Sequence, residues 1–193
     1  DIESNSNTYK LSFSQPIMQT PWQTLTLGLS AIKRDSQTSI LGENYPLSEG
    51  ADENGETKLS ILQLFQDYEL RGKNQVLAFN SQLNVGLGIL GATKNSSEPD
   101  SRFLYWRGQG QWVRELAKNT LLVVGADLQL SPSDLVPKER FGLGGYRSVR
   151  AYRQDTRLTD NGALGTVELR LPIPWISGKN RLFQVVPFID GGV

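Results

Sequence analysis

A regular alternation of apolar and polar residues is the feature that most limits how this chain can fold. Between residues 77 and 89 one parity is almost entirely apolar, and it comprises Leu77, Phe79, Leu83, Val85, Leu87 and Ile89. The other parity is polar or small, and it comprises Asn80, Gln82, Asn84, Gly86 and Gly88. Successive side chains of a β-strand point to opposite faces, so the pattern predicts a strand with one apolar and one polar face. The same alternation within 22–36 and 120–130 favours an all-β fold.

The predicted strands are joined by connections that are alternately short and long. We expect strands near 8–17, 22–36, 58–70, 75–91, 102–115, 120–130, 163–173 and 181–192, of which 58–70 alternates least regularly. The short connections lie at 18–21, 71–74, 116–119 and 174–180, and the long ones at 37–57, 92–101 and 131–162. Short turns at one end and long loops at the other are typical of a transmembrane up-and-down antiparallel β-barrel, with the short turns in the periplasm.

Composition is compatible with such a barrel. Apolar residues make up 38% of the chain and the mean hydropathy is -0.36, which argues against membrane helices. A barrel strand spans the bilayer with only about 9–11 residues, half of them apolar. Four tryptophans, Trp22, Trp106, Trp112 and Trp175, lie near strand ends or on the apolar parity, as in an interfacial girdle. The alternative is a soluble sandwich or lipocalin-like barrel with these residues in its core, although predicted strands of this length exceed the usual soluble length of about 5–6 residues.

Several classes of function are excluded by composition. The chain contains no Cys and no His, which removes thiol catalysis, histidine bases and the common zinc sites, and we expect neither an enzyme nor a cofactor. Twenty basic and 20 acidic residues give no net charge, so no global field attracts nucleic acid. The first residues lack a charged and then apolar export signal, from which we expect an internal part of a longer protein.

The longest predicted loop, 131–162, contains the most specific motif, FGLGGYRSVRAY at 141–152. A glycine-rich run beside basic residues can bind a nucleotide phosphate, but that site needs a helix after the glycines, whereas this run continues through a polar loop into a strand. Two further motifs follow in the last two predicted strands, GALGTVELRLP at 162–172 and VPFIDGG at 186–192. The three motifs, in this order, resemble the haemolysin secretion/activation family, the outer-membrane transporters of two-partner secretion.

The resemblance implies that the long extracellular loop folds back into the barrel and docks its Val-Arg-Gly-Tyr/Phe tip on the inner wall. Val149, Arg150 and Tyr152 match this tip, while Ala151 replaces the family's glycine and would be strained if the position required a positive φ. The loop glycines are Gly142, Gly144 and Gly145. Of these, Gly144 and Gly145 allow a tight turn or a close approach to the wall.

On the wall side, the family's Phe-x-Asp-x-Gly motif matches Phe188, Asp190 and Gly192, and its acidic position one strand earlier matches Glu168. The alternation of side chains along the last two predicted strands places these residues on the same face, independently of the resemblance. The apolar rows Phe183, Val185, Pro187 and Ile189, and Val167, Leu169, Leu171 and Ile173, would face lipid. Asp190 and Glu168 therefore point into the lumen, where the planar fork of Arg150 can bind a carboxylate at two points. Alternatively, Arg150 only neutralises lumen carboxylates and stiffens the barrel.

For the whole protein, the resemblance implies a barrel of about sixteen strands in the outer membrane, and this chain would supply about eight of them. Residues 1–193 would form part of that single barrel domain, and the periplasmic polypeptide-transport-associated domains would lie outside the chain. The implied function is secretion of a large partner polypeptide across the lipid bilayer through the pore, without nucleotide hydrolysis and gated by the inserted loop. The alternatives are an outer-membrane assembly insertase of the same superfamily, a passive porin and a soluble β binding module.

Overall fold

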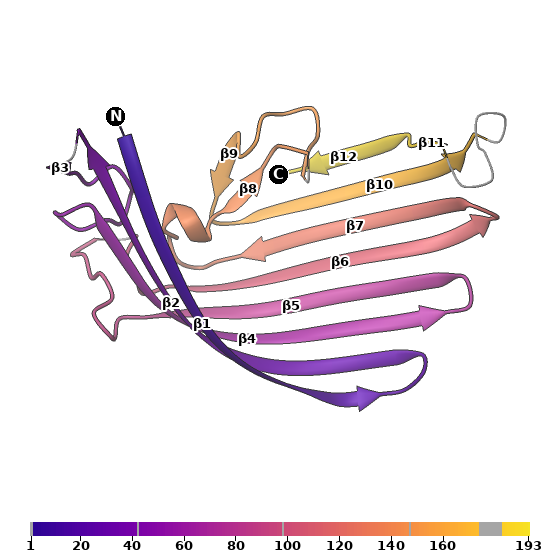
Figure 1. Ribbon diagram of the computed structural model, residues 1–193, viewed down its shortest axis with the longest axis horizontal. Coiled ribbons are helices and arrows are strands. Elements are labelled where there is room, and N and C mark those ends of the chain that lie inside the picture. Colours follow the sequence, from indigo (N-terminus) through magenta and orange to yellow (C-terminus); the bar gives the residue numbers. More distant parts are fainter. Residues whose placement is uncertain (1, 42, 98, 147, 174–182) are drawn as a thin grey trace.

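The computed structural model describes residues 2–41, 43–97, 99–146, 148–173 and 183–193. Figure 1 shows one long, curved sheet whose strands follow one another in chain order, each antiparallel to the next. The strands of the wall are β1 (Ile2–Gln19), β2 (Gln23–Ile40), β4 (Glu56–Gly72), β5 (Gln75–Leu87), β6 (Leu104–Ala117), β7 (Thr120–Leu130) and β10 (Gly162–Pro172). Short strands β11 (Gln184–Val185) and β12 (Phe188–Gly192) both pair with β10, and β3 (Glu43–Asn44) pairs with β2. No helix in the described ranges is long and apolar enough to cross a membrane.

The alternation in the sequence predicted the wall strands well, with corrections at their ends. The strand predicted over 75–91 ends at Leu87, because Leu90 and Gly91 turn the chain with positive φ angles of 55° and 75°. The segment predicted over 181–192 is divided into β11 and β12 around Pro187, which has no N–H to donate to the ladder. Residues 181 and 182, the turn predicted at 174–180 and Trp175 lie outside the described residues.

One face of the sheet is covered by continuous apolar rows. The strand register places in one row, from β1 to β7, Phe13, Leu29, Leu64, Leu83, Trp106 and Leu130. These side chains are not packed beneath another layer, since Leu29 and Leu64 keep 47% and 44% of their surface exposed. In a soluble sandwich they would form the core, whereas on a barrel wall they face acyl chains. The exposed rows therefore favour the wall of a membrane-spanning β-barrel over a soluble sandwich, and within the described residues the sheet is not closed.

The opposite face bears a small apolar core that explains the irregular segment 58–70. Leu59 and Ile61 of β4 lie on this inner face and are 1% and 4% exposed. They form one cluster with Ile32, Phe103 and Tyr105 of the wall and with Leu135 and Val136 of the long loop. Strand β4 is thus apolar on both faces near its N-terminal end, because the long loop covers its inner face there.

Candidate functional site

The long loop lies against the inner face of the wall. After β7 it forms a 3-10 turn, η1 (Pro137–Glu139), and then a two-stranded hairpin that the alternation did not predict, β8 (Phe141–Leu143) with β9 (Arg157–Thr159). Phe141 is 1% exposed and its ring lies so close to Gly162 of β10 that any side chain there would collide with it. Leu143 is also close to Gly192 of β12, where an added Cβ would lie 2.6 Å from its Cδ2 atom. Glycines on the wall therefore make room for the hairpin.

The tip of the loop, residues 144–156, is set by two glycines with left-handed backbone. Gly144 and Gly145 have φ angles of 102° and 100°, and a Cβ on Gly144 would collide with the carbonyl oxygen of Arg153. Gly142 has no positive φ, and a side chain there would meet the carboxylate of Asp155. Ala151 does not adopt a positive φ either, so the strain expected from an alanine at the family's glycine position does not arise.

Arg150 reaches from the tip to the inner wall and binds Asp190 with both arms of its guanidinium. Its Nε donates to Oδ2 of Asp190 at 2.7 Å and its Nη2 donates to Oδ1 at 2.7 Å. The backbone N–H of Arg150 donates to the same carboxylate at 3.3 Å. Asp190 accepts a further hydrogen bond of 2.7 Å from the hydroxyl of Thr166, its register partner on β10. This bidentate arrangement combines charge with a fixed orientation.

Two more wall residues complete the contact around the guanidinium. Nη1 of Arg150 donates to Oε1 of Glu168 at 2.8 Å, and the other oxygen of Glu168 accepts from Arg170 at 3.1 Å. The aromatic ring of Phe188 lies 3.5 Å from the guanidinium carbon, an arrangement that favours a cation. We call Arg150 together with Thr166, Glu168, Phe188 and Asp190 the docking contact. The hydrogen bond to Asp190 raises the pKa of Arg150, so the arginine stays charged at every physiological pH.

The docking contact is more buried than an ordinary surface ion pair. The side chain of Asp190 is 3% exposed, and those of Arg150 and Glu168 are 18% and 17% exposed. An exposed pair contributes about 0–1 kcal/mol, whereas removing one partner of a buried pair costs roughly 3–5 kcal/mol because a charge is left uncompensated. Asp190 therefore resembles the second case, whereas Arg150 and Glu168 keep part of their surface in water.

The structure brings some of the residues singled out in the sequence to the wall, and leaves others away from it. Val149 lies beside Gly192, with its Cγ2 atom 3.5 Å from the position of a Cβ on that glycine. Ala151 and Tyr152 are exposed, and the main chain of Tyr152 only closes the tip by accepting from the N–H of Gly145 at 3.1 Å. Only Val149 and Arg150 of the four-residue tip motif therefore touch the wall.

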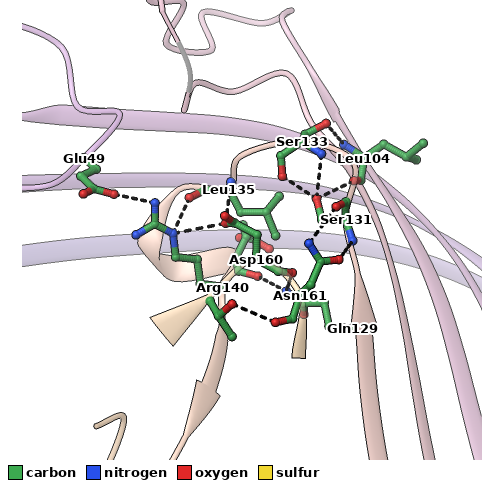
Figure 2. A network of polar contacts seen from close by, with 11 residues as sticks. Glu49, Leu104, Gln129, Ser131, Ser133, Leu135, Arg140, Asp160 and Asn161 are labelled. Atoms are coloured by element: carbon green, nitrogen blue, oxygen red, sulfur yellow. Dashed lines mark hydrogen bonds and ion pairs between the residues drawn. The ribbon is translucent and has the colours of Figure 1, made fainter. Parts of the chain in front are cut away.

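The base of the loop, which we define as residues 131–143 and 157–161, is held by a second polar network that the sequence did not indicate (Figure 2). Arg140 pairs with Glu49 of the loop between β3 and β4 at 2.5 Å and with Asp160 at 3.3 Å. Gln129 of β7, which is fully buried, donates to the carbonyl oxygens of Glu139 and Asp160 at 3.0 and 3.2 Å. These contacts tie the two ends of the loop together. Within the described ranges, no group of three or more acidic side chains could hold a metal ion.

Comparisons with known proteins agree with this architecture. The family model for haemolysin secretion/activation proteins ShlB/FhaC/HecB matches residues 1–193. Among solved structures, CdiB from Escherichia coli superposes with a TM-score of 0.83 at 19% identity, over 98% of this chain and 34% of that one. CdiB from Acinetobacter baumannii superposes with a TM-score of 0.73 at 20% identity, over 99% of this chain and 36% of that one.

This chain thus spans about a third of the length of each CdiB structure, and at such low identity the superpositions establish the fold alone. No sequence among the curated proteins matches it. The family model, by contrast, covers every residue of the chain. The chain therefore belongs to the haemolysin secretion/activation family, whose members are β-barrel transporters of the outer membrane.

Proposed function

We propose that this chain is part of the wall of a two-partner secretion pore, and that its loop 131–162 sets the state of the conduit. Residues 1–193 would belong to one transmembrane barrel domain, closed by further strands of the same protein. A large secreted polypeptide would cross the lumen in an extended form, without nucleotide hydrolysis or any catalytic step by this chain. The observation that supports this most strongly is the docking contact, which holds a loop tip inside the barrel by a single arginine.

The inner wall has the chemistry that an extended polypeptide requires. Below the loop base, its side chains form a hydrogen-bonded series of carboxamides. Gln63 donates to Asn84 at 2.8 Å, Gln82 donates to Asn80 at 2.7 Å, and Asn80 donates to Asp67 at 2.6 Å. Amide side chains can exchange hydrogen bonds with a passing backbone, and they offer no apolar surface on which it would be retained. A groove of about 570 Å³ lies on this part of the inner face, lined by polar residues such as Asp67, Asn80 and Thr166 and also by apolar ones such as Ala78, Phe79 and Leu164.

The arrangement of the loop suits a gate with a small moving part. Among the described residues of the four-residue tip motif, Val149 and Arg150 reach the wall, whereas the base has a buried core and its own polar network. Releasing the docking contact would therefore free the tip without unfolding the base. The rotation needed lies at Gly144 and Gly145, which already adopt conformations that other residues avoid.

Covalent attachment of the tip to the wall tests this proposal. In the full-length protein with any other cysteines replaced, Val149→Cys and Gly192→Cys should form a disulfide, because a Cβ at position 192 would lie 3.5 Å from Cγ2 of Val149. Leu143→Ala is included in this protein and in its control, since Cδ2 of Leu143 would otherwise lie 2.6 Å from the added Cβ. We expect the oxidised protein to stop secreting its partner and a reductant to restore secretion, measured as partner protein in the medium.

The control pair is Gly110→Cys and Ala126→Cys, which would bridge β6 and β7 at opposed positions of the wall ladder. Oxidation of this pair should leave secretion unchanged. Normal secretion by the protein with its tip covalently attached would contradict the proposed gating function.

A further inference from the structure

A second charged group of the loop, 11 residues before Arg150, is buried against the wall. Glu139, at the end of η1, is 7% exposed. One carboxylate oxygen forms an ion pair with Nη1 of Arg34, and the other accepts a 2.8 Å hydrogen bond from the hydroxyl of Tyr105. Its main-chain oxygen accepts from Gln129. A carboxylate buried to this degree must be compensated, and here a cation and a hydroxyl compensate it.

The partners of Glu139 come from well-separated strands of the wall. Arg34 belongs to β2 and Tyr105 to β6, with β4 and β5 lying between them in the sheet. Glu139 therefore links two strands that are not neighbours in the sheet, across its curved inner face. The apolar cluster of Leu135 and Val136 lies beside it, and Tyr105 belongs both to this cluster and to the Glu139 contact.

Residues with positive φ lie at the boundary between the loop base and the tip. Gly144 and Gly145 have positive φ on the outgoing side, and Asp155, with a φ of 49°, has positive φ on the returning side. Just before these positions lie Phe141 and Leu143, 1% and 7% exposed, and just after them lies the exposed tip residue Tyr146 at 86%. The change from buried to exposed side chains thus coincides with the positive-φ positions on the outgoing arm of the loop.

We propose that Glu139 is a positioning residue that holds the loop base on the wall through Arg34 and Tyr105, independently of the docking contact. The tip can then move during secretion while the base stays in place. This inference rests on the proposed function and adds to it the regulation of the loop: Arg150 sets the position of the tip, and Glu139 sets the position of the base. It also implies that the secreted polypeptide does not displace the base from the inner faces of β2 and β6.

Distances between spin labels distinguish the attachment of the base through Glu139 from the attachment of the tip through Arg150. Once any cysteine elsewhere in the full-length protein is replaced, labels can be placed on Arg157→Cys in the base, Tyr152→Cys in the tip and Lys73→Cys in the β4–β5 turn, all of which are exposed. In the full-length protein, Glu139→Gln should at least double the width of the distance distribution between positions 157 and 73. Arg150→Ala should widen the 152–73 distribution to a similar extent and leave the 157–73 distribution unchanged.

Two variants distinguish positioning from a general loss of structure. Removing both charges in Arg34→Gln with Glu139→Gln should recover part of the narrow 157–73 distribution, because no charge is left unpaired. Glu53→Gln, a neutralised exposed carboxylate of another extracellular loop, should change neither distance. Equal widening of both distances in Glu139→Gln and in Arg150→Ala would overturn the inference, since the loop would then dock as one unit.

A secretion intermediate, in which the partner polypeptide is held in the pore, tests directly whether the tip moves while the base stays in place. If a partner polypeptide is fused to a stably folded domain that arrests it in the pore, the 152–73 distance should shift while the 157–73 distance does not. A shift of both distances would overturn the inference and leave the proposed secretion function intact. Unchanged secretion with the tip covalently attached would refute the proposed gating, and the Glu139→Gln distances would still report whether the base has its own attachment.

Discussion

Replacing Arg150 by Ala in the full-length protein is expected to undock the loop tip and to reduce secretion of the partner far more than it reduces the amount of barrel in the outer membrane. The substitution leaves Asp190, only 3% exposed, without its cation and Glu168 with Arg170 alone. Loss of one partner from a buried pair costs roughly 3–5 kcal/mol. Even about 3 kcal/mol corresponds to a shift of roughly 150-fold in the docking equilibrium.

The matched control for this substitution is Arg153→Ala, three residues further along the same tip at an exposed position. It removes the same charge from the loop and should leave secretion unchanged. The two variants are compared by the secreted partner relative to the barrel in the membrane fraction. Equal secretion by Arg150→Ala and the unmodified protein would show that the arginine only neutralises wall carboxylates.

Replacing Phe141 by Ala should have the second large effect, on the stability of the loop base. The ring is 1% exposed, it fills the space left by Gly162, and the guanidinium carbon of Arg107 lies 5.2 Å from its centroid. Truncating a buried phenylalanine costs about 3–5 kcal/mol through lost burial and the cavity that remains. We expect the hairpin of β8 and β9 to open locally, so that a protease added outside the cell cleaves the loop much faster.

Leu158→Ala provides the comparison, because Leu158 lies on the opposite strand of the same hairpin and is 44% exposed. This substitution should raise the cleavage rate only slightly, since surface substitutions usually change stability by no more than about 0.5 kcal/mol. Similar cleavage rates for the two variants would indicate that the hairpin is not packed on the wall through Phe141.

The facing of the wall could be predicted from the sequence because strand parity is a local property. Ile189 and Val167 belong to apolar rows, which fixes Asp190 and Glu168 on the other face wherever the strands lie in the sheet. In the register, Thr166 pairs with Asp190 and Glu168 with Phe188, so these four side chains lie on one face of the sheet. The role of Thr166 as a partner of Asp190 could not be predicted, because it depends on which residue lies opposite on the neighbouring strand.

What the sequence could not show depends on contacts between distant segments. The two-faced apolar character of β4 is explained only by Leu135 and Val136, more than seventy residues later, which cover Leu59 and Ile61. The contact of Glu139 with Arg34 likewise joins residues 105 positions apart. Tyr152 belongs to the tip motif and yet is 62% exposed, because the turn that brings Arg150 to the wall directs the next residues away from it.

A double-mutant cycle on Arg150 and Asp190 tests most directly whether the loop is held by these two side chains. The fraction of docked tip is measured from the 152–73 label distance in Arg150→Ala, Asp190→Ala and the double variant. Since the two groups are in direct bidentate contact, we expect a coupling free energy of about 2–3 kcal/mol, with the double variant little worse than either single one. Additive effects, with a coupling within about 0.5 kcal/mol of zero, would contradict the docking of the tip through this pair.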